Sequence, residues 1–397
     1  MRKLIVLLVA VTVAGAVLAA GDQAYLGIFA ETTQTKMIGM QMPTLPPEVM
    51  KQMPPEALAM MSGAPMRKLN VRLWSPGIAP DDATATLAIP AGLKLGPELN
   101  LDIYRPKAEV AEGGEGGGEG GAPAQQQFTI KLYWGSSPTV RPGQPIIITT
   151  GTMTASERAT IQAQAAKARA AARASAGGEY FYKPDWTTAY WPTKKQPGKI
   201  LPGAALPGHY ELTTNYTGNV AIDVPQNVDF LGGFEITNPQ LNAYPPLDQA
   251  IAFQWKPMAN LLGSHMRIFG MVGTNTLIMW SSSEIREGMD IDWDYMQMAD
   301  VLKLVNSTVM MGPERTDCTV PAGIFQDCDM VNLQWLGYGR GTALETGQPL
   351  PRVQTKTSLM LMLGGKKAPK GMGGGMGGGN MGGGDQGGGD QGGDQGN

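Results

Sequence analysis

The sequence predicts a mainly β protein with two β-sandwich-like domains. Short apolar runs with a period of two recur along the chain, and turns rich in Pro and Gly separate them. Few stretches have the periodicity of a regular helix. Because turns rather than helices connect the runs, a parallel α/β sheet is excluded and sandwich architecture is favoured.

The N-terminus, residues 1–20, has the pattern of a secretory signal peptide. Met1, Arg2 and Lys3 form a short basic segment, and residues 4–18 are apolar without a charge. This apolar run is shorter than the roughly 20 residues that a transmembrane helix needs. We therefore expect cleavage, no membrane span in the mature chain, and an extracytoplasmic location, either periplasmic or secreted.

Residues 21–240 form the first predicted domain. Its strand-like runs have alternating or β-branched apolar residues, the pattern of strands that bury one face. These runs cover residues 25–30, 69–74, 84–89, 99–104, 128–134, 146–150, 209–214, 219–224 and 234–237.

Two segments interrupt the strand pattern of the first domain. Residues 107–127, mainly Gly, Glu, Ala and Gln, bury too little apolar surface to offset the entropy of ordering. We predict a disordered insertion there, between two runs that a hairpin could otherwise join. Residues 155–176 are rich in Ala and stop at Gly177 and Gly178, which predicts a helix with a basic, solvent-exposed stripe.

Prolines near residue 240 mark the boundary to a second predicted domain, residues 241–363. Asn238-Pro239 and Tyr244-Pro245-Pro246 break the strand pattern at that point. The strand-like runs beyond it cover residues 251–255, 266–269, 276–280, 331–335 and 358–363.

A shorter helix is predicted over residues 293–305, followed at the C-terminus by a disordered Gly-rich tail, residues 364–397. Asp290, Asp292 and Asp294 lie just before or within the first turn of this helix, where carboxylates cap free N–H groups and meet the positive end of the helix dipole. The same acids do not open a calcium-binding EF-hand loop, because Tyr295 and Val301 occupy the positions that need Gly and Glu.

The start of the second domain resembles fibronectin type III-like sandwich modules. Ile251-Ala252-Phe253-Gln254-Trp255-Lys256-Pro257 leads through Asn260-Leu261-Leu262-Gly263 into the run at 266–269. This is similar to the family pattern in which an apolar-x-Trp-x-Pro strand passes through a small-residue turn into the next strand. The resemblance covers residues 245–285. It implies an Ig/fibronectin III-like sandwich with a binding or spacing role and no catalytic residues to carry over.

The chain contains two cysteines, Cys318 and Cys328. In an exported protein, an even pair this close in sequence most simply forms one disulfide. Closing so small a loop stabilises the fold by about 2.8 kcal/mol in the chain-entropy model, enough to fix residues 318–328. A redox or metal role is the less favoured alternative, because the spacing is not that of a CxxC motif.

Charge and motif content argue against several functional classes. The net charge of −3 gives no electrostatic support for binding nucleic acid. The sequence has no GxSxG, P-loop, HExxH or CxxC motif, and its two histidines, His209 and His265, are interpreted as structural residues. No cofactor is expected. A hydrolase that assembles a pair of carboxylates in space is the enzymatic alternative that remains.

Methionine is unusually frequent near the N-terminus of the mature chain. Met37, Met40, Met42, Met50 and Met53 are candidate ligands for Cu(I), because thioethers are soft ligands that favour this ion. The alternative interpretation is adaptable apolar packing along short helical turns that begin at Pro46 and Pro55.

Aromatic residues gather between residues 180 and 191. Trp186, Tyr190 and Trp191 are the candidate ligand-binding residues of this group, because an exposed row of rings can stack on sugars or partner side chains. The alternative is that the rings cover a face of the first sandwich.

Taken together, these features predict an exported, non-enzymatic structural or binding protein of the cell envelope. Its expected partner is a cell-envelope protein or polysaccharide. A Met-rich Cu(I)-binding protein is the main alternative, and a hydrolase with a carboxylate pair is a third.

Overall fold

The computed structural model describes residues 24–38, 48, 52–53, 62–105, 128–151, 186–196, 198, 200–201, 203–287, 291, 293–294, 296–341 and 352–368. The protein is mainly β, as predicted, and every strand-like run identified in the sequence is a strand at least in part. The signal segment, the insertion at 107–127, the helix at 155–176 and nearly all of the tail lie outside the described residues.

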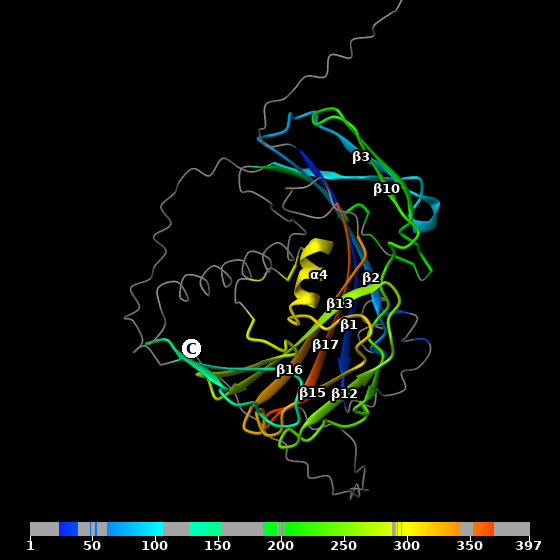
Figure 1. Cartoon of the computed structure of the whole chain (residues 1–397). Coiled ribbons are helices and arrows are strands. Elements are labelled where there is room, and N and C mark those ends of the chain that lie inside the picture. The colour runs from blue at the N-terminus through cyan, green and yellow to red at the C-terminus, as the bar shows by residue number, and fades with distance from the viewer. Residues whose placement is uncertain are drawn as a thin grey trace, which may run out of the picture.

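A ten-stranded sheet forms the centre of the fold (Figure 1). Neighbouring strands run antiparallel except for two parallel pairs, β1 with β17 and β14 with β6. In spatial order the strands are β5 (Asp102–Tyr104), β8 (Thr187–Trp191), β2 (Met66–Ser75), β1 (Tyr25–Met37), β17 (Val353–Gly364), β16 (Met330–Gly339), β13 (Leu261–Val272), β14 (Thr276–Ser281), β6 (Thr129–Trp134) and β7 (Ile146–Thr149).

Two smaller sheets pack on one face of the large sheet, which we call the core face. One has the order β10-β9-β3-β4 and the other the order β11-β12-β15. Their strands are β10 (Val220–Val224), β9 (Gly208–Thr214), β3 (Ala85–Ala88), β4 (Glu98–Asn100), β11 (Ile236–Asn238), β12 (Ile251–Trp255) and β15 (Asp317–Val320), and a 3-10 turn, η1 (Ala91–Leu93), follows β3.

Each small sheet encloses its own hydrophobic core against the large sheet. The first core combines Ile28 and Val71 of the large sheet with Leu87 and Leu212 of the four-stranded sheet. The second core combines Trp335 and its neighbours with side chains of β12 and β15. Alternation along each strand explains why one face is apolar, since successive side chains point to opposite faces.

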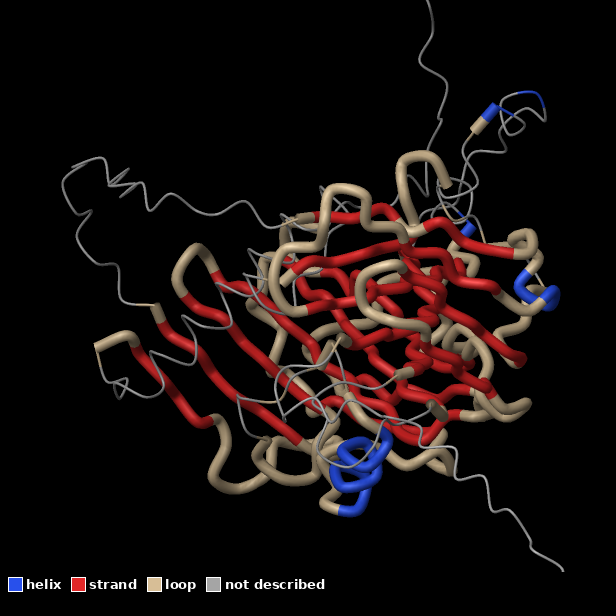
Figure 2. Tube along the Cα trace, turned by 90° about the horizontal axis from the view of Figure 1, so that it is seen from above, coloured by secondary structure: helices blue, strands red, loops and turns tan. Residues whose placement is uncertain are grey.

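The opposite face of the large sheet carries the helix, so we call it the helix face. Helix α4 (Met298–Asn306) lies over β13, where Gly263 leaves room for Val301 and Val305. A third, smaller apolar cluster joins α4 to Leu336 and Tyr338 of β16. Seen from above, the strands lie in layers and α4 lies outside them (Figure 2).

The large sheet takes strands from both sides of the predicted domain boundary near residue 240. β1, β2, β5, β6, β7 and β8 precede that point, whereas β13, β14, β16 and β17 follow it. The first and last strands of the sheet in sequence, β1 and β17, lie next to each other. The two predicted halves therefore share one sheet.

Two strands were not predicted from the sequence, β8 and β15. β8 is buried on both faces, so its sequence Thr-Thr-Ala-Tyr-Trp shows no alternation. β15 overlaps the start of the segment predicted as a disulfide loop, residues 318–328. The runs on either side of residues 107–127 also do not form a hairpin, because β5 is one edge of the large sheet and β6 lies near the other.

Helix α4 begins at Met298, later than the predicted start at residue 293. Gln297 has φ −70° and ψ 152°, which is extended backbone. The buried side chain of Gln354 accounts for the late start: its Oε1 accepts a hydrogen bond of 2.8 Å from the N–H of Met296, and its Nε2 donates one of 2.8 Å to the carbonyl of Asp294. These two hydrogen bonds tie the backbone at Asp294 and Met296 to β17.

Candidate functional site

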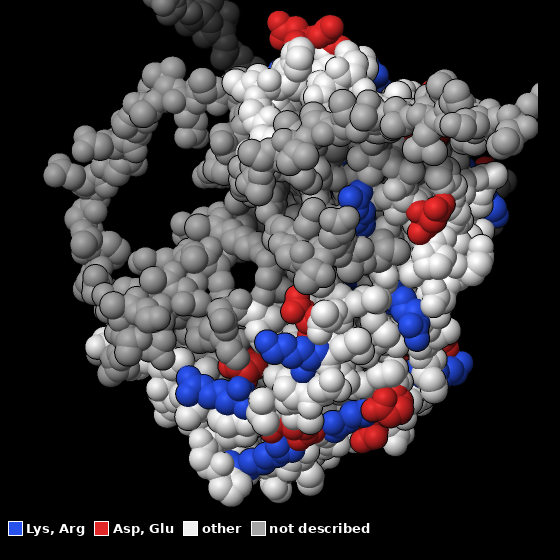
Figure 3. Space-filling model, turned by 45° about the horizontal axis from the view of Figure 1, so that its top comes forward, with Lys and Arg blue, Asp and Glu red and all other residues white. Residues whose placement is uncertain are grey.

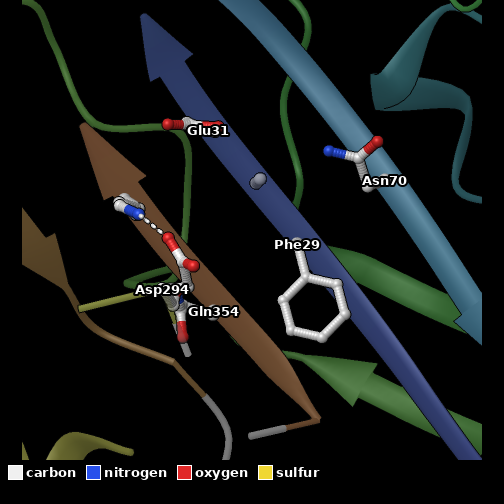
Figure 4. A pocket seen from close by; sticks show the side chains of 7 residues that line it. Phe29, Glu31, Asn70, Asp294 and Gln354 are labelled. Atoms are coloured by element: carbon white, nitrogen blue, oxygen red, sulfur yellow. Dashed lines mark hydrogen bonds and ion pairs between the residues drawn. The ribbon is translucent and has the colours of Figure 1, made fainter. Parts of the chain in front are cut away.

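A polar pocket opens on the helix face at the parallel pair β1–β17 (Figure 4). β1 contributes three of its residues, β2 one and β17 two, and the segment before α4 supplies the last. The lining residues are Phe29, Ala30, Glu31, Asn70, Asp294, Gln354 and Lys356.

Strand register brings these side chains together. Phe29 is the Cα partner of both Asn70 on β2 and Gln354 on β17, and Glu31 is the Cα partner of Lys356. Residues paired across neighbouring strands project from the same face. The alternation that sends Ile28 and other apolar side chains into the first core therefore places this polar set on the helix face.

The pocket combines hydrogen-bond donors and acceptors. Lys356 Nζ lies 3.7 Å from Asp294 Oδ1, and the ammonium lies over the ring of Tyr338 at 5.9 Å from its centroid. Glu31 Oε1 accepts a hydrogen bond of 3.2 Å from the hydroxyl of Ser358. A ligand that both donates and accepts hydrogen bonds fits this arrangement better than a simple ion does.

Phe29 gives the pocket an apolar wall. Its ring packs edge-on against Trp74 at 6.0 Å between centroids, and the side chain is buried. Gln354 is also buried and holds the Asp294 segment in place through its two hydrogen bonds. The pocket therefore has two side chains fixed by packing, with charged groups around its opening.

A buried charged cluster lies on the helix face beneath the segment that carries α4. His265 Nε2 lies 2.9 Å from Glu287 Oε2, and its Nδ1 lies 3.1 Å from the carbonyl oxygen of Val309. The His265 ring stacks on Trp293 at 4.3 Å, and Arg267 lies over the same indole at 4.2 Å. Arg267 Nε is 3.8 Å from the other Glu287 oxygen.

The environment of this cluster shifts the pKa values of two of its members. Burial raises the pKa of Glu287, but the neighbouring His265 and Arg267 lower it by more, so that the net pKa is below the usual value. Burial also lowers the pKa of the Arg267 guanidinium. These charges therefore stabilise one another inside the fold, and they tie the Glu287 segment to β13.

The contacts in this cluster are similar to those of a hydrolytic triad, with Ser282 beside His265 and His265 beside Glu287. Unlike a catalytic serine, however, Ser282 is not exposed to solvent. Ser282 Oγ is 3.5 Å from His265 Nδ1, which is long for a hydrogen bond, and it accepts a hydrogen bond of 2.9 Å from the N–H of Met266. Ser282 and His265 are both fully buried. A substrate has no access to this hydroxyl, so we assign the cluster a structural role.

The aromatic candidates occupy β8 and the residue before it. Trp186 is 3% exposed and Trp191 is 1% exposed, and Trp191 belongs to the first core. Tyr190 is half-buried on the helix face, and the Arg72 guanidinium lies over its ring at 5.8 Å from the centroid. The two tryptophans are thus packed inside the fold, whereas Tyr190 is partly exposed to solvent.

The N-terminal methionine candidates are only partly described. Met37 ends β1, where it is the Cα partner of Met362, and Met53 is half-buried. Met40, Met42 and Met50 lie outside the described residues. Within the described ranges, no three His, Cys, Asp or Glu side chains form a metal-binding group.

The predicted disulfide is not present, because the structure holds both cysteines as free, buried thiols. Burial raises the pKa of Cys318 to about 12 and that of Cys328 to about 11. β15 places Cys318 opposite Phe253 of β12, and Cys328 packs against Gly270 of β13. Two elements of different sheets thus hold the two thiols in the second core.

We expect the native protein to react very slowly with a thiol reagent at pH 8, because both thiols are buried and remain protonated. After unfolding in guanidinium, both cysteines should react. Ellman's assay in the absence and presence of denaturant measures this difference. No reactive thiol in the unfolded chain would instead show that the two cysteines are joined.

Charges of both signs are interspersed over the described surface. Figure 3 shows basic and acidic side chains alternating on the face in view, rather than a patch of one sign. Several are paired, including Lys366 with Asp327 at 3.1 Å and Lys367 with Asp329 at 2.9 Å. In the part of the chain that the structure describes, no helix is long and apolar enough to cross a bilayer.

Comparison of the chain with protein-family models, with curated proteins and with solved structures gives no match.

None of the pocket residues was predicted from the sequence to belong to a site, and Asp294 was predicted only to cap a helix. Glu31 and Lys356 are 325 positions apart in the chain and meet only through the β1–β17 register. The available signal was the alternation within each strand, which marks Phe29 and Glu31 as residues of one face. It does not show which strand lies beside them.

Proposed function

We propose that this protein is an exported, non-enzymatic binding protein of the cell envelope, and that its pocket takes a polar ligand such as a sugar unit of an envelope polysaccharide. The observation that carries the proposal is the convergence of an amide, an ammonium and two carboxylates, from Asn70, Lys356, Glu31 and Asp294, on one opening. Sugar hydroxyls donate and accept hydrogen bonds, so such a mixed set suits them.

Features outside the pocket support the proposal. The predicted signal peptide favours export. The resemblance of residues 245–285 to fibronectin type III-like modules also favours a binding role. β12 and β13, the two strands of that resemblance, lie in different sheets and contribute to the second core between them.

Replacing Lys356 by Met should weaken binding of the preferred oligosaccharide at least tenfold. The expected loss is that of one hydrogen bond to a charged group, about 1.5–3 kcal/mol. Isothermal titration of the mature chain with a panel of envelope oligosaccharides, followed by the same titration of the variant, measures it.

Lys303→Met is the matched control, because Lys303 is an exposed lysine on α4 outside the pocket lining. This variant should bind as the parent does. An equal loss in both variants, or no saccharide binding by the parent at any concentration tested, would contradict the proposed function.

A second candidate function follows from the two carboxylates in the pocket. Glu31 and Asp294 line the same opening, and a pair of acids across a cleft is what glycosidases use. Both acids already have partners, Ser358 and Lys356 respectively, so we favour binding over hydrolysis. Release of reducing ends from a bound oligosaccharide, abolished by Glu31→Gln, would establish the hydrolase instead.

A further inference from the structure

Five methionines gather on the helix face of the large sheet, towards the end away from the pocket. The strand register places them there. Met271 is the Cα partner of Met330, Met279 is the partner of Phe269, and Met362 is the partner of Asn332. We call this group the methionine ladder; its members are Met271 of β13, Met279 of β14, Met330 of β16, and Met360 and Met362 of β17.

The spacing in the methionine ladder lets several thioethers meet. Met271 and Met330 are directly opposite, where Cβ atoms lie about 4.5–5.5 Å apart. Met362 is the Cα partner of Asn332, two positions along β16 from Met330, and the register of β16 and β17 shifts between Val331 and Asn332. A methionine side chain is unbranched and has three rotatable bonds before its terminal methyl group. The sulfurs of these three residues are therefore within reach of one ion.

Exposure distinguishes the methionine ladder from core packing. Met330 is 40% exposed and Met360 is 43% exposed, whereas Leu333 and Leu361, which point to the core face of the same strands, are 0% and 1% exposed. Met271, Met279 and Met362 are half-buried. Solvent, and an ion in it, can therefore reach the ladder.

The surroundings of the ladder favour a soft cation over a hard one. The side chains between the methionines include Asn332 and Phe269, and the nearby carboxylate of Asp329 is already paired with Lys367. Tyr244 donates a hydrogen bond of 3.7 Å to the sulfur of Met362. Uncharged thioethers select Cu(I), whereas carboxylates and carbonyls suit magnesium and calcium.

We propose that the methionine ladder binds Cu(I), with Met271, Met330 and Met362 as the ligands. The site is distinct from the polar pocket and does not depend on the function proposed for it. It also differs from the N-terminal cluster predicted from the sequence. The two groups meet at one point, because Met37 at the end of β1 is paired with Met362.

Competition with a chromophoric Cu(I) chelator under anaerobic, reducing conditions tests this site in the mature chain. The triple variant Met271→Leu, Met330→Leu and Met362→Leu keeps side-chain volume, so the fold should persist, as circular dichroism will check. Its Cu(I) affinity should fall about tenfold or more. The control replaces three half-buried methionines outside the ladder, Met66, Met258 and Met298, and should bind as the parent does.

A third variant, with Leu at Met40, Met42, Met50 and Met53, separates the two methionine groups. Retention of Cu(I) binding in this variant, with loss in the ladder variant, supports the site. Binding lost only in the N-terminal variant would overturn it in favour of the cluster predicted from the sequence. A ladder variant that binds as tightly as the parent, or a parent that binds no Cu(I), would also overturn it.

Discussion

Glu287→Ala should lower the free energy of unfolding by about 3 kcal/mol, because it leaves Arg267 and His265 without their carboxylate. The Glu287 side chain is 20% exposed and its partners are 19% and 0% exposed, so solvent compensates little of the loss. The same carboxylate joins the segment before α4 to β13. Urea unfolding followed by circular dichroism measures the change.

Glu98→Ala is the matched control, since Glu98 is an exposed glutamate on the edge strand β4. This variant should change the free energy of unfolding by no more than about 0.5 kcal/mol. The double variant Glu287→Ala with His265→Ala should be less destabilised than the sum of the two single variants, because the two residues form one pair. Full additivity would show that the contact between His265 and Glu287 contributes nothing to stability.

Lowering the pH should reduce the free energy of unfolding of the parent protein more than that of the Glu287→Ala variant. The folded-state pKa of Glu287 lies below its usual value, so its stabilising contribution is fully present above the unfolded pKa, about 4.3. It is lost as the pH falls from there through the folded pKa. The stability difference between the two proteins should therefore shrink as the pH falls below about 4.3. A difference that grows in acid would reverse the assigned sign.

The strands were predictable because their signal is local. β12, Ile251–Trp255, has strictly alternating burial, and its sequence alternates in the same way. β8 lacked that signal because it is buried on nearly all sides. The start of α4 was misplaced because a residue distant in sequence, Gln354, hydrogen-bonds the backbone at Asp294 and Met296, where local capping predicted a helix.

The candidate site was not predictable from the sequence because it depends on strand order. Alternation assigns Glu31 and Lys356 to faces of their own strands, but the parallel pairing that makes them neighbours joins opposite ends of the chain. The methionine ladder has the same origin. Met271 and Met330 lie in strands whose turns give no indication that they are partners.

Trp335→Ala should cost about 4 kcal/mol of folding free energy, as large-to-small changes at buried aromatic residues do. Trp335 is fully buried in β16. Its ring stacks on Phe234 at 3.9 Å and meets Trp255 of β12 edge-on at 4.5 Å, so it joins the large sheet to the three-stranded sheet. Chemical unfolding of the variant measures the cost.

The same variant tests whether the fold is one cooperative unit. Trp335 lies in the second core and Leu212 of β9 lies in the first, but both cores use the ten-stranded sheet. Because β1 is hydrogen-bonded to β17 within that sheet, we expect the two cores to unfold together. Trp335→Ala and Leu212→Ala should therefore shift a single unfolding transition. Hydrogen exchange of the β9 and β12 amides should quicken together in each variant. Two transitions, each moved by one variant, would instead show halves that fold separately on either side of residue 240.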